Sequence, residues 1–387
     1  MQSPVSFNCL KKLNVLEIIG TATKGGMENY LINFFKHLSP EEFCITCICP
    51  CESPFTAALR EIGIQNVFIT PIADNPEWRS IQLAMEVIRS CQIDVIHAHM
   101  PKSHVLAGIA GSLTHKPVVA TLHGMHVTSY ELGLARAFKS HLITNCQETF
   151  IQALALGIPD ERVYLFHNGV DTKLFIPAKS DSNLRNKMNV PQDCYLIGFA
   201  GRLEYEKGPD LFIRAAAYVH THYPDAHFAV VGDGSMRTEL KQLCRQLQVQ
   251  DHVHFIDWVT DTENVYPLFN LLVHTSRNDG TSLVILEAMS CGCPVAAMAV
   301  GGVRDIVENE RTGMLVDAND WSAMGRQISD LLARPRVLQD MAQASRKRVE
   351  EKFDIQMNAY KTAGLLQSVT GSEKIKSDKN NYKLAHD

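Results

Sequence analysis

Two carboxylates stand eight positions apart in the segment RNDGTSLVILEAMSCGCPV, which runs from Arg277 to Val295. Asp279 lies in a polar stretch, whereas Glu287 interrupts the apolar run LVILEAM. Burial of a carboxylate without partners is costly, so Glu287 needs water or hydroxyl groups beside it. It is either the solvated edge of an ordinary helix or one of two acids directed at a ligand. The apolar residues on both sides of Glu287 favour a ligand, and the paired hydroxyls of a ribose would serve.

The same segment predicts a helix whose first turn faces that ligand. LLVHTS (271–276) has the pattern of a strand, NDGTS (278–282) is its exit loop, and LVILEAMSC (283–291) is helical. Thr281 or Ser282 can cap this helix. The N–H groups of its first turn have no partners inside the helix, so they are available to a ligand.

Two cations lie five positions apart in the loop GRLEYEKGPD (201–210). Arg202 and Lys207 follow an expected strand that ends near Ala200. A guanidinium fork and an ammonium point charge on one loop can converge on a diphosphate. The alternative is that both are solvated charges beside the two glutamates of the same loop.

A pair of glycines, Gly25 and Gly26, lies in the loop TKGGME (23–28) between the first expected strand and a helix. Glycine lets the backbone approach a ligand closely, and a helix N-terminus favours phosphate. The spacing is not that of the G-x-G-x-x-G dinucleotide fingerprint. The alternative is a flexible turn between strand and helix.

Histidines end two expected strands of the first half. His97 and His99 belong to DVIHAH, while His123 and His126 belong to or follow PVVATLH. A single histidine at a strand end is usually structural, but several on adjacent strand ends can face one cleft. His123, which precedes a glycine, is best placed to touch a ligand. The sequence contains no H-E-x-x-H zinc motif and no arrangement that indicates a catalytic triad with these histidines.

The bulk composition excludes some classes of function. A net charge of −5 and a pI near 6.3 do not support a nucleic-acid footprint. The 11 cysteines are odd in number and spread along the chain, which is not typical of a disulfide framework. Four of them lie in CITCICPC (44–51), which is either a soft-metal site or a buried strand. Because Cys47, Cys49 and Cys51 share one strand face, the buried strand is favoured and no metal site is predicted.

The N-terminus lacks the apolar core of a signal peptide, and the longest apolar run is interrupted by Glu287, Pro294 and glycines. A cytoplasmic protein is therefore expected. RAFKSHL (136–142) offers two cations with apolar neighbours. It is either a helix that docks peripherally on the inner face of a membrane or an ordinary amphipathic helix.

Short apolar runs alternate with amphipathic helical patterns along the chain, which predicts an α/β fold with parallel sheets. The first series runs from LNVLEIIG (13–20) to RVYLFHNGVDTKLFIP (162–177), and the second starts at YLIGFAG (195–201). Because two series of similar size suggest two doubly wound, Rossmann-like domains facing a cleft, function is expected in the loops after the strands. The predicted organisation is a domain over 1–178, a polar linker over 180–193, a second domain over 190–354, a helix over 355–370 that crosses back, and a disordered polar tail over 371–387.

Taken together, these motifs resemble glycosyltransferase family 4, whose members are retaining enzymes with the GT-B fold. The stretch from Asp279 to Glu287 resembles the E-x7-E signature of that family. Other matching segments are KGGMEN, TLHG, HNGVDTKLF, GRLEYEKGPDLFIRA, VGDG, AMSCGCPV and GGVRDIV, in order along residues 13–368.

The resemblance implies transfer of a hexose from a nucleotide diphosphate sugar to a glycan or lipid-linked acceptor, in cell-surface polysaccharide or lipopolysaccharide synthesis. No metal and no other cofactor are implied. The first domain would bind the acceptor and the second the nucleotide sugar. The residues implied as catalytic are His123, Arg202, Lys207, Asp279 and Glu287. Those implied in donor binding are Gly25, Gly26, Arg202, Lys207, Asp279, Gly280, Thr281, Ser282, Leu283 and Glu287.

In this assignment Arg202 and Lys207 bind the diphosphate, Glu287 binds the ribose hydroxyls and Asp279 binds the sugar hydroxyls. Asp279 departs from the family pattern, which has a glutamate there, so its reach is shorter by about 1.5 Å. Two alternatives follow. One is a nucleotide-sugar epimerase of the same fold, and the other is a non-catalytic protein that binds nucleotide sugars.

Overall fold

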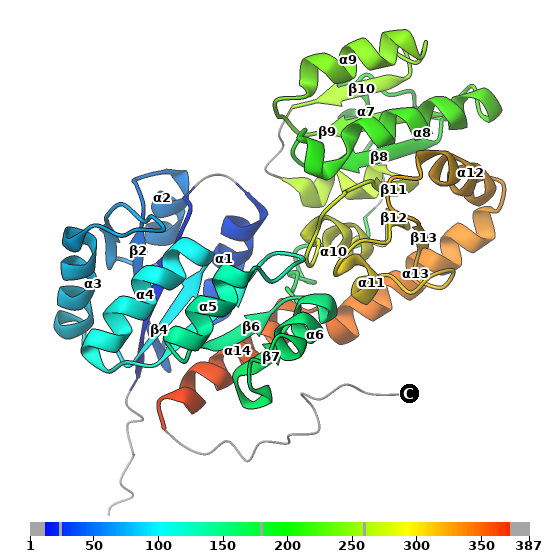
Figure 1. The fold of residues 1–387 in the computed structure, drawn as a ribbon. Coiled ribbons are helices and arrows are strands. Elements are labelled where there is room, and N and C mark those ends of the chain that lie inside the picture. Colours follow the sequence, from blue (N-terminus) through cyan, green and yellow to red (C-terminus); the bar gives the residue numbers. More distant parts are fainter. Residues whose placement is uncertain (1–11, 23–24, 179–180, 258–260, 372–387) are drawn as a thin grey trace, which may run out of the picture.

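The computed structural model describes residues 12–371 except 23–24, 179–180 and 258–260. The described chain forms two α/β domains that lie side by side, each built on one parallel sheet (Figure 1). The predicted fold class is confirmed. The domain limits predicted from the sequence stay predictions. The last strand of the first sheet ends at Leu165, and the first strand of the second sheet begins at Leu196.

The first sheet has seven strands in the order β3-β2-β1-β4-β5-β6-β7. The strands on both sides of β1 are parallel to it, and the register sets Glu17 beside Cys47 on one side and beside His97 on the other. Most of these strands were expected, but β6, with the sequence HLIT, was not. The bounds are β1 Leu13–Ile19, β2 Phe43–Cys49, β3 Val67–Ile69, β4 Val95–His99, β5 Val118–Leu122, β6 His141–Thr144 and β7 Val163–Leu165.

Helices cover both faces of this sheet, as buried strands of a parallel sheet require. Two clusters of buried apolar residues lie on the two sides, and β1 contributes to both, with Val15 and Ile19 on one face and Leu16 and Ile18 on the other. The helices are α1 Gly26–Lys36, α2 Pro54–Glu61, α3 Trp78–Ser90, α4 Pro101–Thr114, α5 Ser129–Ala137 and α6 Gln147–Ala155, with a 3-10 turn η1 at Asp160–Arg162.

The second sheet has six strands in the order β10-β9-β8-β11-β12-β13, around one large apolar core. Its strands are β8 Leu196–Ala200, β9 His227–Val231, β10 Val253–Ile256, β11 Leu271–His274, β12 Val295–Met298 and β13 Met314–Val316. Its helices are α7 Ser182–Lys187, α8 Pro209–His222, α9 Arg237–Gln246, α10 Leu283–Ser290, α11 Val303–Ile306, α12 Trp321–Leu332 and α13 Pro335–Lys352, with 3-10 turns η2 Tyr205–Lys207, η3 Thr262–Asn264 and η4 Tyr266–Leu268.

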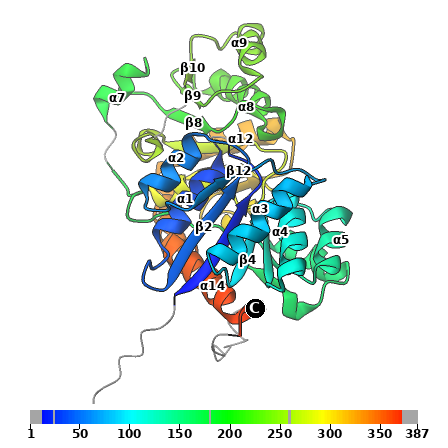
Figure 2. The same ribbon diagram turned by 90° about the vertical axis from the view of Figure 1, so that its left-hand side faces the viewer.

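The last helix, α14 (Ile355–Val369), returns to the first domain and packs along α1, so it lies beside the first sheet (Figure 2). The hydroxyl of Tyr30 in α1 donates to Oδ1 of Asn358 in α14 at 2.5 Å. The segment that leaves the first domain meets the segment that returns to it at Val170, whose amide donates to the carbonyl of Phe353 and whose carbonyl accepts from the amide of Ile355. Apart from Gly371, the predicted tail lies outside the described residues.

Strand order reverses once in each sheet, between β1 and β4 and between β8 and β11. At such a switch point the loops that leave neighbouring strands diverge and open a crevice, which is where ligands of doubly wound sheets bind. The four loops concerned carry Gly25, the residues after His99, the stretch from Arg202 to Lys207, and Asp279. Most of the predicted site residues therefore lie near the switch points of the two sheets, whereas His123 follows the neighbouring strand β5.

Two expectations differ from the structure. The predicted linker contains the short helix α7, which Asp181 caps through the amides of Asn183 and Leu184. The segment 136–142 does not form a helix of its own, because α5 ends at Ala137 and β6 begins at His141.

In the described part of the chain no helix is long and apolar enough to cross a membrane.

Most of the CITCICPC segment lies in β2, as the favoured interpretation predicted, but β2 ends at Cys49, so Cys51 does not share a strand face with Cys47 and Cys49. Cys47 and Cys49 are buried in the sheet, whereas Cys44 and Cys51 are exposed, so the cysteines do not converge on one point. Cysteine takes part in no metal-like cluster within the described ranges.

Candidate active site

The two domains meet where the loop after β11 reaches the ends of β5 and β6. A Cβ on Gly280 would lie only 2.8 Å from the carbonyl oxygen of His123 and 2.9 Å from Nδ2 of Asn145. The next residue, Thr281, donates its hydroxyl to the carbonyl of Asn145. A side chain at position 280 would therefore push the two domains apart.

A second approach of the domains involves the glycines after β1. α1 begins at Gly26, and a Cβ there would lie 3.8 Å from Cδ1 of Leu283, the first residue of α10. Gly25 has the extended conformation that any residue adopts, with φ −155°, but a Cβ there would meet Oε2 of Glu28 at 2.8 Å. The N-termini of α1 and α10 thus lie close to one another, and both can direct N–H groups at one anionic ligand.

Asp279 is paired with two groups of its own domain. Its Oδ2 lies 2.8 Å from Nζ of Lys207 and 3.0 Å from Nε2 of His274. Although burial opposes the effect, Lys207 and His274 hold the pKa of Asp279 well below its ordinary value. Ser282 completes the group with its hydroxyl 3.2 Å from the same His274 nitrogen. Lys207, which is predicted to bind the diphosphate, is therefore paired with Asp279, which is predicted to bind the sugar hydroxyls.

Arg202 lies in the same loop as Lys207 but is not part of this group. Its side chain is 53% exposed, and its guanidinium lies 3.9 Å from the Glu206 carboxylate. A pair at this distance and exposure fixes the guanidinium only weakly. Arg202 is thus free to turn toward a ligand, whereas Lys207 is already held in place.

The first turn of α10 is open. Ser282 occupies the N-cap position, but no side-chain hydrogen bond caps the helix, because its hydroxyl contacts His274 and that of Thr281 binds Asn145. The expectation that Thr281 or Ser282 caps the helix is therefore wrong. An uncapped first turn keeps its N–H groups for a ligand and carries about half a positive charge.

Glu287 is the fifth residue of α10 and is partly buried. The hydroxyl of Tyr266 donates to its Oε2 at 2.6 Å. Burial raises the pKa of Glu287 to about 7, and nearby Glu263 adds to the rise, although the hydrogen bond from Tyr266 opposes it. A carboxyl in this state gains hydrogen-bond partners when hydroxyl groups of a ligand arrive.

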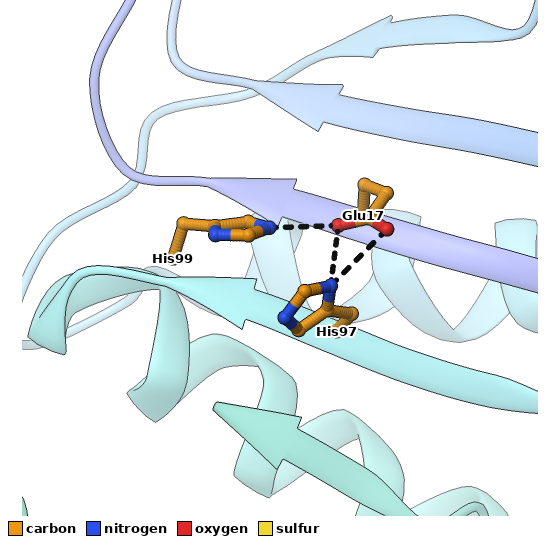
Figure 3. Close-up of side chains that lie close together, drawn as sticks. All are labelled: Glu17, His97 and His99. Carbon is orange, nitrogen blue, oxygen red and sulfur yellow. Dashed lines mark hydrogen bonds and ion pairs between the residues drawn. The ribbon is translucent and has the colours of Figure 1, made fainter. Parts of the chain in front are cut away.

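His123 stands at the end of β5 as predicted, partly exposed, and is the outermost of a set of histidines. Its Nε2 lies 3.1 Å from Nδ1 of His99. His99 and His97 both contact the fully buried carboxylate of Glu17 (Figure 3). His126 does not belong to this set, because it lies beside Glu148 on the surface.

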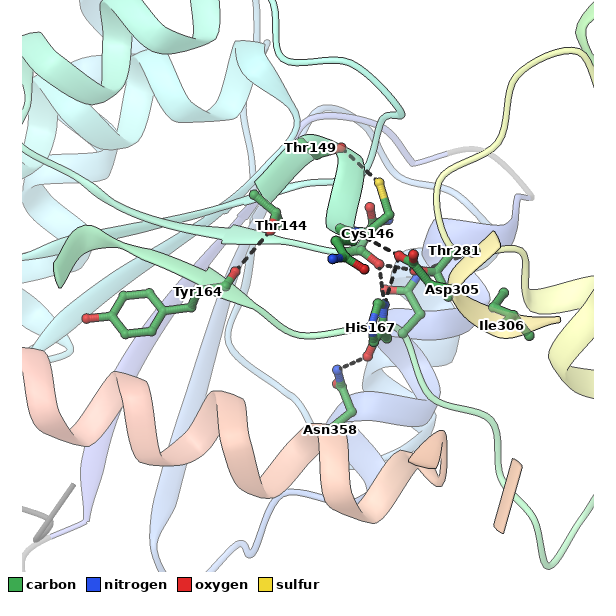
Figure 4. A network of polar contacts seen from close by, with 12 residues as sticks. Thr144, Cys146, Thr149, Tyr164, His167, Thr281, Asp305, Ile306 and Asn358 are labelled. Atoms are coloured by element: carbon green, nitrogen blue, oxygen red, sulfur yellow. Dashed lines mark hydrogen bonds and ion pairs between the residues drawn. The ribbon is translucent and has the colours of Figure 1, made fainter. Parts of the chain in front are cut away.

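A polar network fixes the junction of the domains (Figure 4). The carbonyl of Asn145 accepts from Thr281 and lies 3.0 Å from Nδ1 of His167, and the carbonyl of His167 accepts from Asn358 of α14. On the other side of the junction, Oδ2 of Asp305 accepts from the amide of Gln147 at 2.7 Å. These contacts hold α6, α10, α11 and α14 together at one place.

Sequence reasoning missed four side chains that position the predicted ones. His274 contacts Asp279, and Tyr266 contacts Glu287. Asn145 lies against Gly280, and Glu17 contacts two of the histidines. His274 ends a strand and could have been found by the rule that selected His123, whereas Tyr266 and Glu17 carry no signal in the sequence. The assembled site offers cations, open helix N-termini and a protonatable carboxyl, which suits an anionic ligand with hydroxyl groups.

Comparison with known proteins agrees with this reading. Residues 24–174 match the family model described as Glycosyltransferase Family 4, and residues 180–348 match the model described as Glycosyl transferases group 1. A D-inositol 3-phosphate glycosyltransferase of Salinispora tropica is 36% identical over 362 residues, covering 81% of this chain and 75% of that protein. An Escherichia coli UDP-Gal:alpha-D-GlcNAc-diphosphoundecaprenol alpha-1,3-galactosyltransferase is 26% identical over 355 residues, with 85% and 90% covered.

Among solved structures, Anabaena HepE in complex with UDP aligns with a TM-score of 0.81 at 24% identity, over 92% of this chain and all of that one. This likeness supports the two-domain GT-B fold. The match of both domain models in order along the chain, and the identity to the Salinispora tropica enzyme, lead to one conclusion: the chain is a glycosyltransferase of the GT-B type and belongs to glycosyltransferase family 4.

Proposed function

We propose that this protein transfers a hexose from a nucleotide diphosphate sugar to a glycan or lipid-linked acceptor, with retention of the anomeric configuration. The reaction would belong to the synthesis of cell-surface polysaccharide or lipopolysaccharide, at the cytoplasmic face of the membrane. The donor lies between the two domains, with its nucleotide on the second domain.

The observation that carries the proposal is the arrangement around α10. Lys207 is held by Asp279 at 2.8 Å beside the uncapped first turn of this helix, and Glu287 follows in its second turn. The distance from the first turn to Glu287 suits a nucleotide whose phosphates meet the N–H groups while its ribose hydroxyls meet the carboxyl. We assign Arg202 and Lys207 to the diphosphate.

Transfer from such a donor requires departure of a nucleoside diphosphate. Cations and helix N-termini aimed at the leaving diphosphate stabilise the charge that develops on it. Asp279 is ionised, but its Oδ2 is already engaged by Lys207 and His274, which does not favour attack on the sugar. We therefore assign it to holding Lys207 and to contacts with the sugar hydroxyls.

The activity of the Escherichia coli relative supports the donor and the acceptor class. That protein uses UDP-Gal and a GlcNAc-diphosphoundecaprenol acceptor. Its match extends over 85% of the present chain, so it includes both sides of the site. A uridine nucleotide and a diphosphate-linked lipid are consequently the first donor and acceptor to test.

The test is a panel of radiolabelled nucleotide sugars offered with lipid-linked and free glycan acceptors. We expect transfer from one donor, with the anomeric configuration of the product equal to that of the donor by NMR. An inverted product would contradict the retaining mechanism. Isomerisation of the sugar without transfer would favour an epimerase, and binding without turnover would favour a non-catalytic protein.

The roles of the cations are tested with substitutions in the same assay. Lys207→Ala is expected to lower kcat/KM by about 100-fold or more, and Arg202→Ala by a smaller factor, because charged hydrogen bonds to the diphosphate are lost. Lys347→Ala is the matched control, since that ammonium lies on α13 and its side chain is 74% exposed. Unchanged turnover in both loop variants would disprove the diphosphate assignment. EDTA is expected to leave the rate unchanged.

A further inference from the structure

Behind His123 lies a buried chain of polar groups that the proposed reaction does not yet use. Nε2 of His123 lies 3.1 Å from Nδ1 of His99, and Nε2 of His99 lies 2.9 Å from Oε2 of Glu17. His99 is 1% exposed and Glu17 is fully buried. We infer that Glu17, acting through His99, is a positioning residue that fixes the tautomer of His123, so that its Nδ1 serves as a hydrogen-bond acceptor for a hydroxyl of the substrate.

The ionised carboxylate of Glu17 sets the direction of each hydrogen bond in this chain of polar groups. An ionised carboxylate only accepts, so Nε2 of His99 must carry the proton. A neutral imidazole with a protonated Nε2 has an unprotonated Nδ1. His99 therefore accepts from His123, whose Nε2 must carry the proton. In neutral His123 this leaves Nδ1 with a lone pair and no proton.

Glu17 is held in the ionised state by several donors. Its carboxylate also contacts Nδ1 of His97 at 3.2 Å, and Nε2 of that ring lies 2.8 Å from the Thr121 hydroxyl. Although burial opposes the effect, His97 and His99 lower the pKa of Glu17 to about 2. Burial and the charge of Glu17 raise the pKa of Tyr30, which is therefore neutral. Glu17 therefore carries a negative charge at the inner end of the chain of polar groups.

The two outer imidazoles are neutral at physiological pH. Burial lowers the pKa of His99 to about 4, although its contact with Glu17 opposes this. Burial and the neighbouring histidines also lower the pKa of His123 well below its ordinary value. The chain therefore passes no net charge to the cleft and sets only which nitrogen of His123 is protonated.

The remaining nitrogen of His123 is accessible to a ligand. Its residue is partly exposed and stands where Gly280 of the second domain comes closest. Six buried side-chain atoms in the described part of the chain lack a hydrogen-bond partner, and Nδ1 of His123 is not among them. The hydroxyls of a donor sugar or of an acceptor are the groups in the proposed reaction that can donate to it, so this inference rests on the proposed function for its ligand.

A metal ion is the competing explanation of the same residues. Glu17, His97 and His99 present one ligand atom each, and these atoms lie within 4.8 Å of one another. However, the two histidine nitrogens already lie at hydrogen-bond distance from the carboxylate, at 2.9 to 3.2 Å, which satisfies all three groups without an ion. The two explanations differ in the direction of the contact with His123, because a metal on Nε2 of His99 would make Nδ1 of His99 the donor and would leave the proton of His123 on Nδ1.

NMR of protein labelled with ¹³C-histidine tests the tautomer directly, with the His123 signals assigned from their loss in His123→Gln. The Cδ2 chemical shift of His123 should be that of the Nε2–H tautomer, and it should not change after dialysis against EDTA. A Nδ1–H tautomer in the wild-type protein, or a resonance that moves when Zn²⁺ is added, would overturn the inference. This readout needs no substrate, so it stands apart from the panel assay of the proposed function.

Variants separate positioning from structural support. In Glu17→Gln the new amide can donate to His99, which reverses the chain, so the His123 signal should move toward the Nδ1–H tautomer. The matched variant is His97→Gln, because the His97 side chain contacts the same carboxylate but not His123. In this variant His123 should keep its wild-type tautomer. With an active donor, Glu17→Gln should lower kcat roughly tenfold, with a much smaller change in the affinity for UDP. Equal shifts of the His123 signal in both variants would show structural support only.

Discussion

Lys207 and Asp279 face each other at 2.8 Å, and this pair must be loosened or shared when a diphosphate binds. Asp279→Asn keeps the shape of the side chain but removes its charge and releases Lys207. We expect UDP to bind roughly threefold to tenfold more tightly to this variant, because the diphosphate no longer competes with a carboxylate. Turnover should fall, since Lys207 loses the partner that positions it.

Isothermal titration with UDP measures the first effect and the transfer assay measures the second. Asp279→Glu is the matched variant, because it keeps the charge and restores the acid that the family pattern has at this position. Weaker binding of UDP to Asp279→Asn would contradict competition and would instead show that Asp279 acts only by holding Lys207 in place.

Glu287 makes the stability of the protein dependent on pH. Burial raises its pKa from 4.5 to about 7, so between these pH values the folded protein holds a proton that the unfolded chain has released. The free energy of unfolding therefore falls as pH rises through this window. Glu287→Gln should remove the fall, and at pH 8 without donor it should be more stable than the wild type by up to about 3 kcal/mol. Urea unfolding at pH 5 and pH 8 measures the difference.

The same carboxyl should release protons when the donor binds. Ribose hydroxyls donate better to a carboxylate than to a carboxylic acid, so UDP should lower the pKa of Glu287. Titration calorimetry near pH 7 in two buffers of different ionisation enthalpy detects this release. Equal proton release in the wild type and in Glu287→Gln would place the titrating group elsewhere.

How far single residues can be predicted depends on where they lie. Arg202, Lys207, His123 and Asp279 follow strands, and the rule that loops at strand ends carry function selects them. Tyr266 comes from a 3-10 turn whose place beside α10 is decided by packing. The pairing of Lys207 with Asp279 joins residues 72 positions apart, which no spacing along the chain reveals.

At the scale of elements, the loop after β8 is held against β11 by a glycine. Gly208 has φ +64°, and a Cβ there would lie 2.0 Å from the carbonyl oxygen of Thr275. Gly208→Ala should lower the free energy of unfolding by more than about 2 kcal/mol, because both the conformation and the contact exclude a side chain. Thermal unfolding measures the loss.

Gly133→Ala is the matched control for this element. Gly133 lies in helix α5, and a Cβ there would meet no atom within 4 Å. Alanine should therefore stabilise the helix by roughly 0.5–1 kcal/mol. If both variants lost stability to the same degree, the close approach of Gly208 to Thr275 would not explain the effect.

Most of the buried strands could be predicted, because each shows an apolar run bounded by glycine or polar residues. β6 overlaps the segment 136–142, whose pattern indicates an amphipathic helix, and α7 lies in a polar stretch without an apolar period. The open N-terminus of α10 could not be predicted either. Ser282 and Thr281 are good capping residues, but tertiary contacts with His274 and Asn145 take up their hydroxyls.

At the scale of the whole molecule, Arg346 joins segments that are distant in sequence. Its guanidinium donates to the carbonyls of Thr172, Phe175 and Ser290. Arg346→Ala leaves these acceptors without their donor, so the free energy of unfolding should fall by about 1–3 kcal/mol. Differential scanning calorimetry measures this, with Lys347→Ala as the control on the same helix. An unchanged melting temperature would show that water replaces the guanidinium without cost.

Two domains and a helix that crosses back were predictable from the repeated strand–helix series and from the long helical pattern after residue 353. The junction between them was not. It depends on close backbone approaches, such as that of Gly280 to His123, and on bonds to main-chain carbonyls. Neither leaves a pattern in a single sequence.

The bridge between Val170 and Asp354 has a consequence for how such proteins can be recombined. The second domain leaves the first at Val170 and returns at Asp354, so topologically it is an insertion whose two ends lie side by side. Residues 171–353 can therefore be treated as a cassette. Exchanging this cassette between relatives should transfer the preference for the nucleotide sugar while the host domain and α14 keep the choice of acceptor.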